Sequence, residues 1–292
     1  MKGPAAPVVV GVDGSSSALG AVSWAADECA RHRAPLRLVH AHLLPTRGYP
    51  EIVLTGNEVR HAMEARAREW LDEAVVAAHA VAPGIQVTTH LAFSGTVTAL
   101  IEESREARLM VLGSQGLGNV TGLLVGSTAL ALASHGRCPL VVVRGPGVAD
   151  GPVVVGVDGS PTSEAAVAFA FDAASTRGVP LTALMVWEDF MIHSGYDATR
   201  LAINWDYVED EQRRLLAERL AGWQEKYPDV RVSRVVVRDR PVRAMMRLAA
   251  DAQLLVVGSR GHGGFTGMLL GSTSQALVHH AVCPLAIVRP TS

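Results

Sequence analysis

The sequence predicts an α/β protein made of two tandem domains, each with a five-stranded parallel sheet flanked by helices. Short Val- and Leu-rich runs alternate with longer stretches that have apolar residues at helical spacing. The short runs are too continuously apolar for a sheet with one solvated face, and this favours strands buried on both faces. The whole pattern also occurs twice, since Asp13 recurs as Asp158, 145 positions later.

The repeat defines the domain organisation. Residues 8–15 reappear as 153–160, Gly126-Ser127-Thr128 as Gly271-Ser272-Thr273, and Cys138-Pro139-Leu140 as Cys283-Pro284-Leu285. The period is far longer than the roughly 20–50 residues of solenoid repeats, so it indicates a duplicated domain. Residues 145–152 are rich in Gly and Pro, which helices and strands tolerate poorly. We therefore place the domains at 1–147 and 148–292.

The elements follow one another in the same order in both copies. In the first copy we expect strands at 8–12, 36–41, 85–91, 108–113 and 139–143, and helices at 17–33, 56–81, 96–107 and 127–136. In the second copy we expect strands near 153–157, 181–186, 230–237, 253–258 and 284–288. Ligands of parallel α/β sheets bind beyond the carboxyl ends of the strands, so the loops after strands one, two and four should carry the function.

Composition excludes several classes of protein. The 292 residues suit about two domains, and 49% hydrophobic with 18% charged residues argue against disorder. A net charge of −2 without a block of like charges argues against nucleic-acid binding. No apolar run approaches the roughly 18 residues of a membrane span, and no signal-peptide pattern opens the chain. We expect a cytoplasmic protein that does not associate with membranes. Three cysteines without C-x-x-C spacing predict neither disulfides nor a metal site.

The loop after the fourth strand is the most informative segment. Residues 258–271 are rich in glycine and lead into a helix that begins near Ser272, which we expect to be its N-cap. Glycine permits positive φ and close backbone approach, and the amides of such a loop and of a helix start attract phosphate. A flexible lid or a plain connection is the alternative. The loop recurs at 113–129, and this favours phosphate binding.

The spacing of the glycines distinguishes this loop from other phosphate-binding loops. No Lys precedes Ser127 or Ser272, so neither loop is the P-loop of NTPases. Instead the pattern G-x2-G-x9-G-[ST] fits Gly113, Gly116, Gly126 and Ser127, and again Gly258, Gly261, Gly271 and Ser272. With Asp13 and Asp158 ending the first strands and Cys-Pro opening the fifth, the chain resembles a tandem universal stress protein of the ATP-binding kind.

This resemblance implies a Rossmann-like fold that binds ATP, with any Mg²⁺ carried by the phosphates. Asp13 and Asp158 would contact the nucleoside, the backbone of Ala41 and Val186 the adenine, and the glycine loops and helix starts the phosphates. The implied binding residues are Gly11, Asp13, Ala41, Gly113, Gly116, Gly118, Gly126, Ser127, Thr128, Gly156, Asp158, Val186, Gly258, Arg260, Gly261, Gly263, Gly271, Ser272, Thr273 and Ser274. The alternative for the two aspartates is an Asx turn that caps the loop, aided by Ser15 and Ser160.

The two copies differ in their loops, and other candidate residues are less specific. The second loop has Arg260, Gly263-Gly264 and Ser274 where the first has Gln115, Gly118-Asn119 and Ala129, so we expect weaker ATP binding in the first domain. His40 and His42 share one face of a strand without an obvious third metal ligand, which leaves metal binding as the lesser alternative to a structural or nucleotide-flanking role. Trp187 lies near the expected adenine position.

These features predict an ATP-binding regulator of the stress response that acts through a protein partner of unknown identity. The alternatives are a slow ATPase, a nucleotidyl or phosphoryl transferase, and a scaffold without ligand. No catalytic residue is identified, because no general base or carboxylate pair accompanies the loop. The apolar fifth strands, 140–143 and 285–288, are expected at sheet edges that cover each other. We also expect a homodimer.

Overall fold

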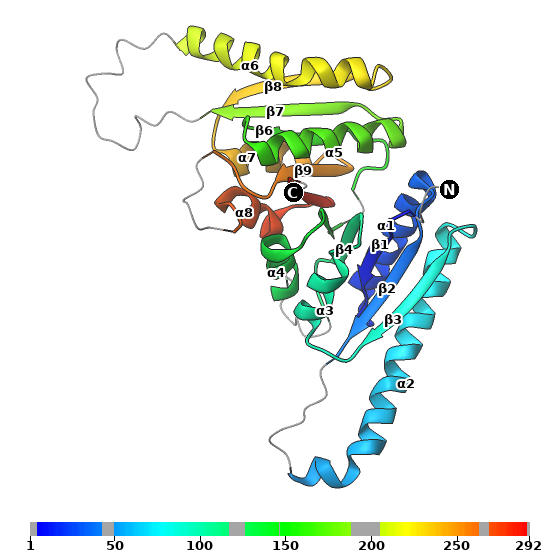
Figure 1. Ribbon diagram of the computed structural model, residues 1–292. Helices are drawn as coiled ribbons and strands as arrows, with labels where there is room; N and C mark the ends of the chain where they lie inside the picture. Colours follow the sequence, from blue (N-terminus) through cyan, green and yellow to red (C-terminus); the bar gives the residue numbers. More distant parts are fainter. Residues whose placement is uncertain are drawn as a thin grey trace. The chain divides into compact units, whose positions relative to one another are not determined.

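The computed structural model describes residues 5–42, 50–116, 126–145, 147–187, 205–262 and 269–290, without the side chains of 50–57 and 59. Its contacts divide the chain into two compact units, Met1–Arg144 and Gly145–Ser292 (Figure 1). The division falls at the start of the Gly- and Pro-rich stretch in which the sequence places the domain joint. Each unit is an α/β domain, as predicted.

The first unit has a parallel sheet with the strand order β3-β2-β1-β4-β5. Its elements are β1 (Val8–Gly11), α1 (Ser16–His32), β2 (Leu36–Ala41), α2 (Pro50–Val81), β3 (Val87–Ala92), α3 (Thr96–Glu103), β4 (Leu109–Gly113), α4 (Ser127–His135) and β5 (Leu140–Val143). Val10 pairs with Leu38 on one side and Val111 on the other. The chain therefore reverses its direction across the sheet between β1 and β4.

The second unit repeats this topology, with the order β8-β7-β6-β9-β10. Its elements are β6 (Val153–Val157), α5 (Pro161–Arg177), β7 (Leu181–Trp187), α6 (Trp205–Lys226), β8 (Val232–Arg238), α7 (Pro241–Ala249), β9 (Leu254–Gly258), α8 (Ser272–His280) and β10 (Leu285–Val288). Val155 pairs with Ala183 and Val256, which repeats the register of Val10. Every strand expected from the sequence is present in both units.

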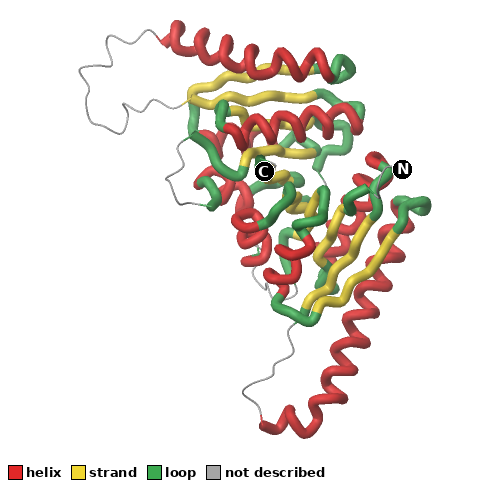
Figure 2. Tube along the Cα trace, viewed as in Figure 1, coloured by secondary structure: helices red, strands yellow, loops and turns green. Residues whose placement is uncertain are grey.

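Helices cover both faces of each sheet (Figure 2). In the first unit α1 packs against α2 and the central strands, while α3 packs against α4. In the second unit α5 packs against α6 and α7 against α8. The central strands are consequently buried on both faces, and Val8, Val9 and Val10 have no exposed surface.

The third strand of each unit departs from the predicted burial. Thr88, Thr89 and His90 of β3 are exposed, and β8 also carries exposed residues. β3 ends the strand order, where α2 packs on it but α3 packs on β2 instead. The expectation that all strands are buried on both faces is therefore wrong for β3 and β8.

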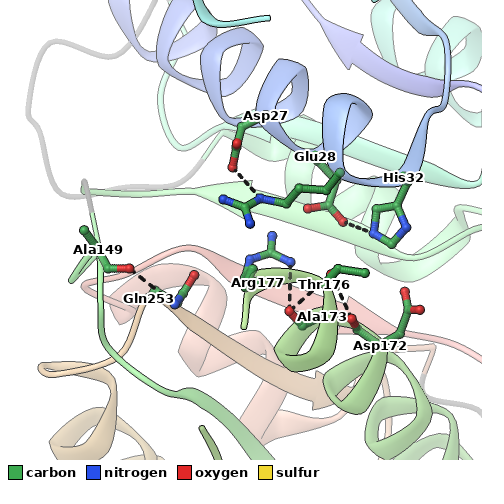
Figure 3. Close-up of polar contacts among 10 residues, drawn as sticks. Asp27, Glu28, His32, Ala149, Asp172, Ala173, Thr176, Arg177 and Gln253 are labelled. Atoms are coloured by element: carbon green, nitrogen blue, oxygen red, sulfur yellow. Dashed lines mark hydrogen bonds and ion pairs between the residues drawn. The ribbon is translucent and has the colours of Figure 1, made fainter. Parts of the chain in front are cut away.

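The first helices of the two units begin in the same way. The Ser15 hydroxyl accepts the N–H of Ala18 at the start of α1, and the Ser160 hydroxyl accepts that of Ser163 at the start of α5. These two serine caps fix the turn between the first strand and the first helix, and this turn carries the aspartate of the repeat. Further along α1, the Glu28 carboxylate lies 3.0 Å from Nε2 of His32, one turn along the helix (Figure 3).

The three cysteines are free and buried, as expected of small apolar side chains. Burial raises the pKa of the Cys29 and Cys138 thiols to about 12 and that of Cys283 to about 11. Such thiols are not nucleophiles at neutral pH. Among the described helices, none is both long enough and apolar enough to cross a membrane.

Candidate functional site

A cavity of about 170 Å³ lies at the carboxyl ends of β1, β2 and β4 in the first unit. It is lined by Gly11, Val12, Asp13, Ala18, Val39, Ala41, Thr96, Leu100, Leu112, Gly113, Gln115, Gly116, Gly126, Ser127, Thr128 and Ala129. The lining contains every site residue that the sequence predicts for this domain, except Gly118, which lies outside the described residues. The structure thus brings together residues from four separate segments of the chain.

The lining of this cavity also includes residues that the sequence did not predict. Leu100 from α3 and Leu112 from β4 lie under Gly11, where a Cβ would be 2.7 Å from a methyl carbon of Leu112. Thr96, the first residue of α3, donates its hydroxyl to the Ala41 carbonyl at 3.2 Å. These residues supply an apolar surface and one hydroxyl beside the end of β2. Of the lining residues that were missed, Val39 alone had a signal in the sequence, because alternation along β2 puts it on the same face as Ala41.

Asp13 forms the Asx turn that was the alternative to nucleoside binding. Its Oδ1 accepts the backbone N–H of Ser15 at 3.0 Å and the Ser15 hydroxyl at 2.6 Å. Asp158 does the same with Ser160, at 3.0 and 2.7 Å. A carboxylate has about four acceptor positions, and the turn uses Oδ1 of each side chain. Asp13 still lines the cavity, and Asp158 is exposed.

The second carboxylate oxygen of each aspartate faces the glycine loop. Oδ2 of Asp158 accepts the N–H of His262 at 3.1 Å. A Cβ on Gly116 would lie 2.6 Å from Oδ2 of Asp13, and one on Gly261 would be closer still to Oδ2 of Asp158. Glycine is therefore needed here because the aspartate and the loop backbone are in contact.

This contact corrects the expected role of the loop glycines. Positive φ was expected in the loop, yet none of its described glycines has it. Positive φ occurs instead at Gly14 and Gly159, among other glycines outside the loops; these two follow the two aspartates at φ 82° and 79°. Gly113 and Gly258 are required by close packing, since a Cβ would meet Ser17 at 2.6 Å and Thr162 at 2.8 Å.

The helix starts also differ from the expectation. The N-caps of α4 and α8 are Gly126 and Gly271, and neither helix has a side-chain cap among the described residues. Ser272 is instead the first helical residue, because the extended backbone of Gly271 already occupies the cap position. In the first unit Ser127 and Thr128 line the cavity, so its wall includes the uncapped first turn of α4. Such a turn presents free N–H groups to an anion.

The remaining candidates of the second unit lie at the equivalent positions. Val186 lies in β7 beside Val237, and Gly156 lies against Met245. The Ser274 hydroxyl donates to the Gly258 carbonyl at 2.7 Å and thus ties α8 to the end of β9. The N–H of Gly271 likewise donates to Ser259, at 2.9 Å. Ser272 and Arg260 are exposed and Thr273 is half-buried, while Gly263 lies outside the described residues.

The aromatic residues at the end of β2 lie on the other face of the sheet from the cavity. His40 alternates with Val39 and Ala41 along the strand, and its Nδ1 donates to the Val12 carbonyl at 2.7 Å. Its ring contacts Trp70 of α2 at 5.3 Å. No group of three potential metal ligands occurs among the described residues. The hydrogen bond to Val12 and the ring contact with Trp70 give His40 a structural role.

His42, directly after β2, and Trp187, the last residue of β7, occupy equivalent positions in the repeat. The His42 ring contacts Phe93 at 5.5 Å, and Trp187 stacks on Trp205 at 5.7 Å. Burial lowers the pKa of His42, aided by the nearby His40, so the imidazole is neutral at pH 7. A contact of Trp187 with a ligand stays a prediction.

The fold defines an α/β protein whose two units share one sheet topology, and a cavity lies at the switch point of the first sheet. The sequence model of the universal stress protein family matches residues 5–144 and 151–289. The chain therefore belongs to the universal stress protein family and contains two of its domains. It is similar to a universal stress protein of Mycolicibacterium smegmatis, with 42% identity over 97% of both chains.

Other comparisons agree with this assignment. A universal stress protein of Mycobacterium tuberculosis is 43% identical over 97% of this chain and 96% of its own length. The crystal structure of a universal stress protein from Archaeoglobus fulgidus covers 98% of this chain and 99% of its own, with a TM-score of 0.71 and 19% identity. At that identity the structural likeness supports the fold alone.

Proposed function

We propose that both domains bind an adenine nucleotide, ATP in particular, and that the protein regulates a stress response through its nucleotide occupancy. The observation that carries this proposal is the convergence of Asp13, Ala41, the glycine loop and the start of α4 on one cavity. Asp13 and the glycine loop that begins at Gly113 are 100 positions apart in the sequence. Their meeting at the switch point of the sheet fits the place where α/β folds bind ligands.

The chemistry of the cavity suits the parts of a nucleotide. Leu100, Leu112 and Val39 offer apolar surface to a base, beside the Thr96 hydroxyl and the Ala41 backbone. Asp13 offers acceptors to ribose hydroxyls. The loop amides and the uncapped start of α4 suit the phosphates, which would carry any Mg²⁺ with them.

The second domain repeats the parts that define the site. Asp158 again joins the first strand to the glycine loop, through its hydrogen bonds to Ser160 and His262. Gly271 again begins the last helix without a side-chain cap among the described residues. The duplication supports two nucleotide sites per chain.

Regulation accounts for the site better than catalysis. Phosphoryl transfer to water needs a residue that positions or activates the nucleophile. Among the described lining residues Asp13 is the only carboxylate, and its Oδ1 already accepts two hydrogen bonds from Ser15. We further propose that the nucleotide-bound protein is a homodimer recognised by a regulatory protein partner. Light scattering with and without ATP tests whether the nucleotide-bound protein is a homodimer.

The test of the proposed function is the content of freshly purified protein. Protein purified without added nucleotide is denatured, and the released compounds are separated and identified by mass. We expect adenine nucleotide in a fixed ratio to protein. Protein that releases none, and that binds none in subsequent calorimetry, would contradict the proposal. Conversion of ATP to ADP during incubation would instead support the slow ATPase.

A further inference from the structure

The glycine loops of the two domains differ in their basic residues. Residues 114–125 contain no Lys, Arg or His, whereas the equivalent residues 259–270 contain Arg260 and His262. Arg260 is exposed, and no carboxylate among the described residues pairs with it. The second loop thus carries an unbalanced cation that the first one lacks.

The structure places a second basic group of this loop next to the strand-one turn. The His262 amide donates to Asp158, and Nε2 of its ring lies 3.6 Å from the position that a Cβ on Gly159 would take. The Arg219 guanidinium of α6 lies 3.5 Å from the same position. Because Arg219 pairs with Glu164 at 3.1 Å, its charge is already balanced. Arg260 and His262 therefore make the difference.

The equivalent turn of the first domain is covered by an apolar ring. A Cβ on Gly14 would overlap the indole of Trp70. Arg66 lies over that indole, 5.4 Å from its centre, but pairs with Glu69 at 2.8 Å. Among the described residues that line the first cavity, Asp13 is the only charged one. The first site therefore has Asp13 without a basic loop residue, whereas the second has Arg260 as well as Asp158, a difference of one positive charge.

The charge of a site determines whether each additional phosphate of the ligand increases the affinity. The amides of a loop and a helix start together act as about half a positive charge, which suits a ligand with one negative charge. Each further phosphate adds charge that a cationic side chain must balance, and a charge-assisted hydrogen bond changes affinity by about tenfold or more. Asp13 and Asp158 oppose such added charge in both domains alike, so Arg260 makes the difference between them.

From these observations we propose that the two domains divide their ligands by charge. The first domain takes nucleosides and singly charged nucleotides, in which extra phosphates gain no affinity, and the second domain takes polyphosphates through Arg260, with His262 beside it. This inference rests on the proposed function, since it assigns a ligand class to each of the two nucleotide sites.

Each site can be measured in the full chain if the other is blocked. Gly126 lines the first cavity and a Cβ there meets nothing within 4 Å, so Gly126→Leu is the variant designed to block the first site. Gly271→Leu is the matched variant, since its Cβ lies at least 3.4 Å from its neighbours. Both glycines have φ values that any residue adopts, −58° and −71°.

The experiment is calorimetric titration of both variants with adenosine, cyclic AMP, ADP and ATP, each without and with Mg²⁺. In Gly126→Leu we expect ATP to bind about tenfold or more tightly than cyclic AMP. In Gly271→Leu we expect cyclic AMP to bind at least as tightly as ATP. The same ligand ranking in both variants would overturn the division by charge.

Reciprocal substitutions in these variants test the role of Arg260. Arg260→Gln in Gly126→Leu should lower the ATP-to-adenosine affinity ratio about tenfold, and Gln115→Arg in Gly271→Leu should raise it. Both positions are solvent-accessible, so circular dichroism is expected to show unchanged folding. An unchanged ratio in Arg260→Gln would overturn the role of this residue. Failure of either blocked variant to bind any of the four ligands would overturn the proposed function itself.

Discussion

Oδ2 of Asp158 accepts the backbone N–H of His262 at 3.1 Å, so the side chain that follows β6 holds the loop that follows β9. Its Oδ1 accepts both the N–H and the hydroxyl of Ser160. One carboxylate thus connects the first turn of the domain to its phosphate loop. This connection makes the aspartate a structural element of the site as well as a candidate ligand contact.

The two oxygens of Asp158 predict a specific effect of Asp158→Asn. An amide has one acceptor and one donor group, so whichever way it turns, its NH₂ meets the N–H of either Ser160 or His262. We expect nucleotide affinity in the second domain to fall about tenfold and unfolding free energy by about 1 kcal/mol. Calorimetry and urea unfolding measure both. Asp150→Asn, at an exposed position in the joint, is the control and should change neither.

The contact between Gly116 and Asp13 predicts that Gly116→Ala weakens the first site. The new Cβ would lie 2.6 Å from Oδ2 of Asp13, and this overpacking should cost about 1–3 kcal/mol because the loop must move away. Gly84→Ala is the control, since this exposed glycine is not part of the cavity lining and its Cβ meets nothing within 4 Å. Equal nucleotide affinity of the two variants would show that the contact does not matter.

Thr96 predicts a difference in base recognition between the domains. Its hydroxyl donates to the Ala41 carbonyl, whereas the equivalent residue of the second domain is Pro241. Thr96→Val keeps the shape and removes the hydrogen bond, so adenosine affinity in the first domain should fall about fivefold, the equivalent of one neutral hydrogen bond. Titration of the double variant that combines Thr96→Val with Gly271→Leu measures the adenosine affinity of the first domain. Unchanged affinity would place the base elsewhere.

The lowered pKa of His42 predicts an acid-dependent loss of stability. The unfolded imidazole binds a proton below its ordinary pKa of 6.5, while burial keeps the folded one neutral to lower pH. Protonation therefore favours the unfolded state, and this penalty is absent well above 6.5 and grows as the pH falls below it. His42→Phe removes the titration and keeps the ring contact with Phe93.

Urea unfolding of wild type and His42→Phe at several pH values isolates this effect. The stability of wild type relative to the variant should fall as the pH drops from about 7.5 to about 5.5. Titrating groups that do not interact with His42 contribute equally to both proteins and cancel in the difference, whereas the interactions of His42 with His40 and Glu64 are part of the measured effect. A difference independent of pH would show that His42 does not titrate differently in the folded state.

The sequence predicted those parts of the fold and site that local chemistry determines. Strands such as β1 and β4 are apolar runs because both of their faces are covered, so their positions could be read within a residue or two. The glycines at 113 and 116 are spaced by contacts that exclude a side chain, and so they appear as a pattern. Repetition of the pattern at 258 and 261 separated it from chance.

What the sequence could not predict depends on packing between distant segments. Thr96 and Leu100 line the cavity because α3 packs beside β2, and neither residue type is distinctive. The exposure of β3 follows from its place at the end of the strand order. The clamp between Asp158 and His262 joins residues 104 positions apart, so no local pattern reveals it.

The most direct test of the central claim is the number of nucleotides that one chain binds. Protein stripped of nucleotide by refolding is titrated with ATP in a calorimeter, alongside Gly126→Leu and Gly271→Leu. The account predicts two sites per wild-type chain, the tighter one lost in Gly271→Leu and the weaker one lost in Gly126→Leu. Saturation of the wild type at a single site, or a site count unchanged in both variants, would contradict it.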